Sequence, residues 1–303
     1  MTENTIFDSV YKTLLNKTPK LLVPFINEAF NRDYPADAPI VQLSNEHEGE
    51  RGLRITDSVF KVGDRIYHVE CQSTPDATMA IRMIEYDFAV ALEHASIGDT
   101  SYEIELPASC VLFLRHGPRT PDELTIKVKL PDGGSFDYTT RVFKAQSYSI
   151  TDIFDKGLLI LLPFYLMRYE EVLAQIEADD DRANALVAEC AELRGDLETL
   201  TVSSGDSLLY EQLVELIIRV NDYLFRAHEV LGKKVRKAMG GEVLELLNER
   251  AERMEREARE QGIEQGIEQG IDQLATKLAA RGIDSDTINA AIEELRADQA
   301  TKG

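Results

Sequence analysis

Two acidic residues that could hold a metal ion, Asp57 and Glu70, flank the dipeptide Gly63-Asp64. They stand in two short runs rich in β-branched and aromatic residues, LRITDSVFKV and RIYHVECQS. These runs predict a β-hairpin, and a glycine in first position suits its two-residue turn. In that register Asp57 is directly opposite Glu70, with Cβ atoms about 4.5–5.5 Å apart. Gln72 is two residues beyond Glu70 and therefore on the same side of the strand.

Two carboxylates opposed across a hairpin repel each other, and a divalent cation between them removes the repulsion. Hard oxygen ligands suit Mg²⁺ or Mn²⁺. Such an ion can polarise a phosphoryl oxygen and acidify a bound water. Gln72 cannot act as a base, but it can orient that water or hydrogen-bond a phosphate. The pattern thus predicts a Mg²⁺ (or Mn²⁺) site at Asp57 and Glu70. Spacing alone equally favours an exposed polar face with two unrelated acids.

Other polar residues near this hairpin have two interpretations each. Arg82 and Tyr86 are spaced i, i+4 on a predicted helix, so they share a face and either contact phosphate or form a structural pair. His68 is expected opposite Val59, as a local polar residue rather than a ligand. One of three acids before the hairpin could supply a third carboxylate ligand, although each also fits a solvated acidic loop: Glu46, Glu48 and Glu50.

The elements that must position these residues follow from hydrophobic periodicity. Helical spacing predicts one or two helices over 5–31, with a break near Thr18-Pro19. A helix over 78–95 has a wide apolar face that includes Ile81, Phe88 and Leu92. Further strands are expected in the runs ASCVLFLRH, ELTIKVKL and RVFKAQSYSI, the last two joined by a turn at 131–134.

After residue 150 the pattern is helical. A helix capped by Asp152 is expected first, then an acidic helical stretch over 168–200. A single helix over 206–239 follows, ending in a basic run that is either a DNA contact or a charged helix end. That run contains Lys233, Lys234, Arg236 and Lys237.

Composition narrows the classes of protein. The chain has 303 residues and a net charge of −21, which argues against a non-specific coat for nucleic acid. The three cysteines lie far apart, as in a reduced cytoplasmic protein, and form no thiolate metal cluster. No run approaches the roughly 18 apolar residues of a membrane span, and the first residues lack a signal-peptide pattern.

Several segments in order carry a family resemblance: FDSVYK, RITDSVF, VECQS, AIRMIEYDFAVALEH, LLILLPFYLMR and the tail EREAREQGIEQGIEQGI followed by LAARGIDSDTI. The chain resembles the Rpn family of recombination-promoting nucleases and putative transposases, in the PD-(D/E)XK nuclease superfamily. The resemblance spans nearly the whole chain.

The resemblance implies an α-β-β-β-α-β core and a metal-dependent DNA endonuclease that promotes recombination. It implies metal ligation at Asp57 and Glu70, with Gln72 where the superfamily has lysine. Thr56 stands where the superfamily has proline. The glutamine leaves the usual electrostatic stabiliser unassigned. Lys61, four residues from Asp57 on the same strand face, is either a substitute or a solvent-exposed strand lysine.

The tail carries a four-residue repeat, QGIEQGIEQGI. Ile263, Ile267 and Ile271 form a slanting stripe on a helix, with glycines beside it. Such a helix is marginal alone, so we expect it to pack on a partner, most simply a second copy in a symmetric dimer. The alternative is a connector without a partner. A separate product beginning at Met254 is a speculative addition.

We therefore expect an α/β protein with three parts. A PD-(D/E)XK nuclease-like domain, a mixed sheet flanked by helices, covers residues 1–165. A helical extension covers 166–241, and a charged helix with the glycine-interrupted repeat and a short terminal helix covers 242–303. The expected function is Mg²⁺-dependent cleavage of DNA. The alternative is a non-catalytic module with a nuclease fold, working through its tail.

Overall fold

The computed structural model describes residues 4–43, 46–49, 52–55, 58–76, 78–98, 101–241 and 277. The chain divides into two compact units, Met1–Glu242 and Val243–Gly303. The predicted self-associating tail, with its isoleucine stripe, lies outside the described residues. The predicted boundary at residue 165 falls inside the first unit and stays a prediction from the sequence.

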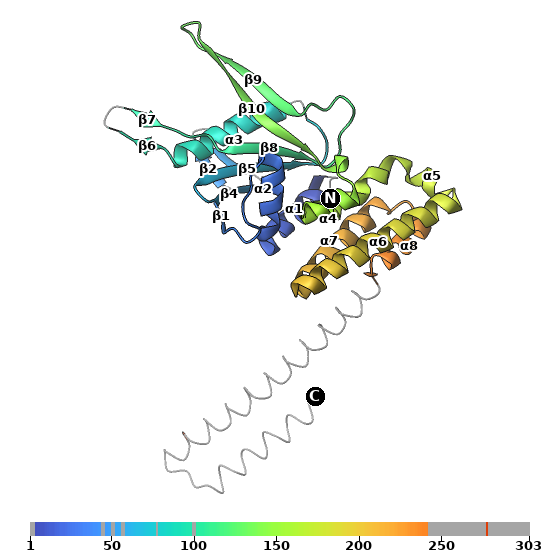
Figure 1. The fold of residues 1–303 in the computed structure, drawn as a ribbon. Helices are drawn as coiled ribbons and strands as arrows, with labels where there is room; N and C mark the ends of the chain where they lie inside the picture. Colours follow the sequence, from blue (N-terminus) through green and yellow to red (C-terminus); the bar gives the residue numbers. More distant parts are fainter. Residues whose placement is uncertain are drawn as a thin grey trace. The chain divides into compact units, whose positions relative to one another are not determined.

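The first unit is an α/β structure built on a six-stranded mixed sheet of order β1-β4-β5-β8-β10-β9 (Figure 1). Strands β5, β8 and β10 run parallel to one another, and the other neighbours are antiparallel. The strands of this sheet are β1 (Ile40–Gln42), β4 (Ser58–Val62), β5 (Arg65–Gln72), β8 (Ala108–Phe113), β9 (Glu123–Lys129) and β10 (Ser135–Lys144). Two small pairs stand apart: β2 (Glu46–Gly49) with β3 (Gly52–Ile55), and β6 (Ser96–Ile97) with β7 (Tyr102–Glu103).

The predicted hairpin register is confirmed for the described residues. Val62 pairs with Arg65 across the turn, and Ser58 pairs with Val69. Gly63 has φ +62°, which glycine adopts without strain. The run predicted as strand over 53–62 contains two described strands, because residues up to Ile55 pair with β2 whereas β4 pairs with β1 and β5.

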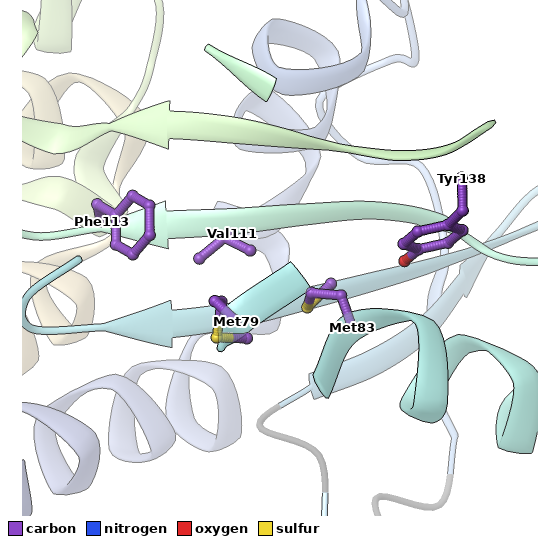
Figure 2. Packing of buried hydrophobic residues seen from close by; sticks show 5 residues of the cluster. All are labelled: Met79, Met83, Val111, Phe113 and Tyr138. Atoms are coloured by element: carbon purple, nitrogen blue, oxygen red, sulfur yellow. The ribbon is translucent and has the colours of Figure 1, made fainter. Parts of the chain in front are cut away.

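Helices cover both faces of the sheet. On one face lie α1 (Asn4–Lys17) and α2 (Leu22–Phe30), separated by a 3₁₀ turn at the predicted break. Their rings pack on the strands: Phe25 lies 4.7 Å from Phe143, and Phe30 lies 5.0 Å from Tyr67, between ring centroids. On the other face lies α3 (Met79–Glu93), whose Met79 and Met83 pack against β8 and β10 (Figure 2).

The buried face of α3 differs from the predicted one. Ile81, Phe88 and Leu92 were expected on the packed face, yet they are 56%, 48% and 53% exposed. The helix instead turns a narrower stripe to the sheet, with Asp87 fully buried in line with Met83. A helix whose apolar residues span such a wide arc can bury only the sector that faces its neighbours.

The helical half of the unit also refines the predictions. Ser149, not Asp152, is the N-cap of α4 (Ile150–Asp155), and Asp152 completes a capping box from the third position. The single helix expected over 206–239 is two helices. Within the described residues 159–241 the helical elements are a buried 3₁₀ helix (Leu159–Val172), α5 (Leu173–Glu177), α6 (Asp180–Ser204), α7 (Ser207–Leu224) and α8 (Glu229–Ala238). Likewise, the strand expected in RVFKAQSYSI starts earlier, at Ser135, and ends at Lys144.

The turn between α7 and α8 depends on a close approach. A Cβ on Gly232 would meet the Cβ of Phe225 at 2.8 Å, so glycine lets α8 fold back there. None of the helices in the described part of the chain combines the length and apolar character needed to cross a membrane.

Two glycines should respond oppositely to alanine. Gly63→Ala forces a left-handed backbone on a residue with a Cβ and should lower the free energy of unfolding by about 1–2 kcal/mol. Gly195→Ala, inside α6 with open space around its Cβ, should raise it by about 0.5–1 kcal/mol. Urea denaturation of both variants measures this. A Gly63→Ala variant as stable as the wild type would contradict the assigned hairpin turn.

Candidate functional site

The structure describes all but one of the residues predicted for the site. Glu70 lies in β5 and is 2% exposed, and Gln72 ends the same strand, half-buried. Lys61 is exposed on β4. Arg82 lies on α3. Asp57 lies outside the described residues, so its predicted pairing with Glu70 stays a prediction.

The centre of the site is His68, which is fully buried between two carboxylates. Its position opposite Val59 is as predicted. Its Nδ1 lies 2.6 Å from Asp87 Oδ1, and its Nε2 lies 3.0 Å from Glu70 Oε1. Because His68 and Glu70 are two residues apart on β5, both side chains point toward α3. The imidazole therefore connects a strand carboxylate to a helix carboxylate inside the protein.

Asp87 accepts further hydrogen bonds from the two neighbouring strands. The hydroxyl of Ser109 on β8 donates to its Oδ2, and the hydroxyl of Tyr138 on β10 donates to the same oxygen at 2.5 Å. Burial, together with the charge of Asp87, raises the pKa of Tyr138 well above its usual value, so the phenol keeps its proton. Each oxygen of this buried carboxylate thus has a partner, as buried charge requires.

The charge on His68 follows from this enclosure. Burial alone lowers the pKa of an imidazole, but hydrogen bonds to Asp87 and then Glu70 outweigh it and raise the pKa to about 9. His68 is therefore protonated at neutral pH and donates from both ring nitrogens. A positive ring between two carboxylates reduces the electrostatic cost of burying all three groups.

Arg82 and Tyr86 border this network, on the α3 face expected for them. The guanidinium Nη2 of Arg82 lies 3.7 Å from Glu70 Oε2, and its Nη1 lies 3.9 Å from Asp76 Oδ2. The Arg82 side chain is 36% exposed, so it connects the buried Glu70 with solvent. The ring of Tyr86 meets His68 edge-on, with centroids 6.0 Å apart.

Asp76 is a second carboxylate at the entrance to the site. Its side chain accepts hydrogen bonds from the backbone N–H and hydroxyl of Thr78, which lower its pKa. It is therefore a fixed negative charge beside Arg82. Pro75 and Asp76 also line an open pocket of about 480 Å³, together with Phe113 and the loop Gly117–Pro121.

The donor set around Glu70 suits a metal ion in part. His68 holds Oε1 and so fixes the orientation of the carboxylate, with Oε2 toward Arg82. The Arg82 nitrogens lie 3.7 and 3.9 Å from the Glu70 and Asp76 carboxylates, beyond ordinary hydrogen-bond length. Among the described residues there is no group of three or more His, Cys, Asp or Glu suited to a metal. A complete site therefore needs Asp57 and solvent ligands.

The remaining predicted candidates lie elsewhere or cannot be placed. Glu46 and Glu48 are in β2, whose side chains lie outside the description, as does Glu50. The basic cluster lies on α8, which packs on α6 and α7 rather than on the sheet. There Lys233, Lys234 and Lys237 are exposed, and Arg236 is paired with Asp222.

Sequence reasoning missed Asp87, Ser109 and Tyr138. One signal was available for Asp87, which falls four residues after Met83 on the helix and so in line with a buried residue. Ser109 and Tyr138 carry no such signal, because Ser109 stands in a run that reads simply as a buried strand and Tyr138 precedes the predicted strand RVFKAQSYSI. Comparisons with protein-family models, with curated proteins and with solved structures found no match for this chain.

The proton on His68 should make stability depend on pH. Its pKa in the folded protein, about 9, exceeds the ordinary 6.5, so its contribution is complete below pH 6.5 and is lost as pH rises through 9. Relative to His68→Gln, the wild type should lose up to about 3 kcal/mol of unfolding free energy over this range. Chemical denaturation with a chelator present measures it. A pH-independent difference between the two proteins would contradict the buried imidazolium.

Proposed function

We propose that the chain hydrolyses DNA phosphodiester bonds with Mg²⁺ or Mn²⁺ held at Glu70. The supporting observation is the buried Glu70 carboxylate, anchored at Oε1 by His68, which is itself anchored by Asp87. A metal-binding carboxylate functions best when a hydrogen-bonded neighbour fixes its orientation. A carboxylate that served only in packing would not need its orientation fixed by His68 and, through His68, by Asp87.

The proposed roles divide among six residues. Asp57 and Glu70 hold the cation, which supplies an activated water and a polarised phosphoryl oxygen. Gln72, at the end of β5, orients the water or the phosphate. Arg82, with its exposed guanidinium, contacts a phosphate oxygen, and Tyr86 supports it through the ring contact 5.8 Å from its guanidinium carbon. Lys61 is a further phosphate contact on the same side of β4.

The order of the elements supports a PD-(D/E)XK-like core. Apart from the two small pairs, the chain runs α2, β1, β4, β5, α3, β8, which is an α-β-β-β-α-β order. The antiparallel β4–β5 hairpin, the helix after it and the parallel strand β8 follow in the sequence expected for that core. Under this proposal the candidate ligands lie on the central hairpin, and the helix after it carries Arg82.

Removal of the Glu70 charge tests the proposal. Glu70→Gln keeps the shape of the side chain but weakens a metal ligand, so cleavage of plasmid DNA with Mg²⁺ should fall at least about hundredfold. Asp57→Asn should do the same. Asp64→Asn, in the exposed hairpin turn, is the matched control and should cleave like the wild type. Thermal melting of each variant separates lost activity from lost folding.

The outcome also distinguishes the non-catalytic alternative. Cleavage that requires Mg²⁺ and Glu70 supports a nuclease. A folded wild-type protein without cleavage activity, tested on single-stranded and double-stranded DNA with both metals, would leave a binding module that keeps this fold.

Gln72 should affect rate rather than stability. Gln72→Ala removes the group that orients water or phosphate and should lower the cleavage rate by about tenfold to hundredfold, with little change in melting temperature. Gln72→Lys introduces the positive group that the superfamily has at this position and should retain or raise the cleavage rate. If both variants cleave at the wild-type rate, Gln72 has no catalytic role.

A further inference from the structure

Strand β9 forms a free edge of the sheet, in a hairpin with β10 that extends past the neighbouring strands (Figure 1). Hydrogen bonds from Leu130 N to Gly134 O and from Val142 N to Asp122 O fix which β9 residues face β10. Backbone direction alternates along an antiparallel strand, so the even-numbered residues bond β10. The N–H and C=O groups of the odd-numbered residues 123–129 point outward. In the described part of the chain no strand pairs with them.

The side chains of β9 alternate in the same register. Leu124, Ile126 and Val128 lie on the α3 side, and each is only half-buried. Beside Val128, Phe136 of β10 is 51% exposed. The strand therefore leaves apolar surface uncovered along the edge whose backbone groups are unpaired.

We propose that β9 pairs with β9 of a second copy of this chain, antiparallel and centred on Ile126. In this register the two six-stranded sheets become one continuous sheet around a two-fold axis. Glu123 lies opposite Lys129 of the partner subunit, and this attraction occurs twice. Leu124 lies opposite Val128 of the partner subunit, and the two copies of Ile126 meet at the axis. The outward backbone groups bond across the edge.

The charge pattern favours this register over its neighbours. A shift of two residues one way places Lys127 opposite Lys127 of the partner subunit, and like charges directly opposed destabilise a pair of strands. A shift the other way also places Glu123 opposite a lysine, Lys127 of the partner subunit, but it pairs fewer residues of β9 and leaves Lys129 beyond the paired region. No salt bridge among the described residues includes Glu123 or Lys129, and on their own β10 they lie opposite Arg141 and Ser135. This dimer does not depend on the proposed nuclease activity or on the tail.

Cysteine cross-linking tests the register in the full-length chain. Opposed residues in a non-hydrogen-bonded pair have Cα atoms about 4.5 Å apart, within disulfide range. Ile126→Cys should therefore cross-link to itself under mild oxidation with oxidised glutathione. Val128→Cys is the matched control, because its two copies would lie roughly 14 Å apart. The wild type reports any contribution from Cys71, which is half-buried, since Cys110 and Cys190 are buried.

Charge reversal tests the same pairing without oxidation. Glu123→Lys or Lys129→Glu turns two attractive pairs into two repulsive ones and should weaken dimerisation at least about tenfold in sedimentation equilibrium. The double variant restores opposite charges and should recover the wild-type dissociation constant. If the dimer formed only through the tail, the two single variants and the double variant would all dimerise like the wild type. Equal cross-linking of the two cysteine variants, a monomeric wild type, or assembly indifferent to both reversals would overturn the proposal.

Discussion

The packing of α3 on the sheet depends on the proton that keeps the buried His68 positively charged. Without it, Asp87 and Glu70 would share a buried space with a neutral ring and would lose the positive charge that lies between them. With it, three charged groups form a connected chain whose outer members are also hydrogen-bonded or ion-paired. Removing His68 leaves two buried carboxylates without the positive charge between them, which costs more than the intact chain contributes. The network therefore acts as a unit.

This unit explains how α3 is placed on the sheet. The first half of the helix lies on an apolar layer in which Met79 and Met83 meet Val111 and Phe113 (Figure 2). Such a layer tolerates small shifts, because dispersion contacts have little directionality. Asp87, one turn further, tolerates none, since it must reach strands β5, β8 and β10 together. The polar end therefore fixes the position of the helix, and with it the distance between Arg82 and Glu70.

The sequence predicted what is local and missed what is distant. The hairpin register followed from period-two runs and Gly63, and α3 followed from helical spacing, because both signals lie within one element. Asp87 contacts partners 19, 22 and 51 residues away, and periodicity carries no information at those separations. The same limit explains why Ile81 was wrongly expected on the packed face of α3. Apolar residues show which faces of a helix can be buried, but the neighbouring strands decide which face is buried.

If the chain cleaves DNA as proposed, a polyanionic substrate poses a particular problem for it, because its net charge is −21. Long-range attraction cannot bring it to DNA, so binding must come from positive charge concentrated at the site. The geometry around Glu70 allows this, because His68 offsets one buried carboxylate from beneath and Arg82 extends a guanidinium toward solvent. A divalent cation bound at Glu70 would add two more positive charges where the phosphate sits. The acidic surface then acts against non-specific DNA binding, and the metal becomes a condition for binding as well as for hydrolysis.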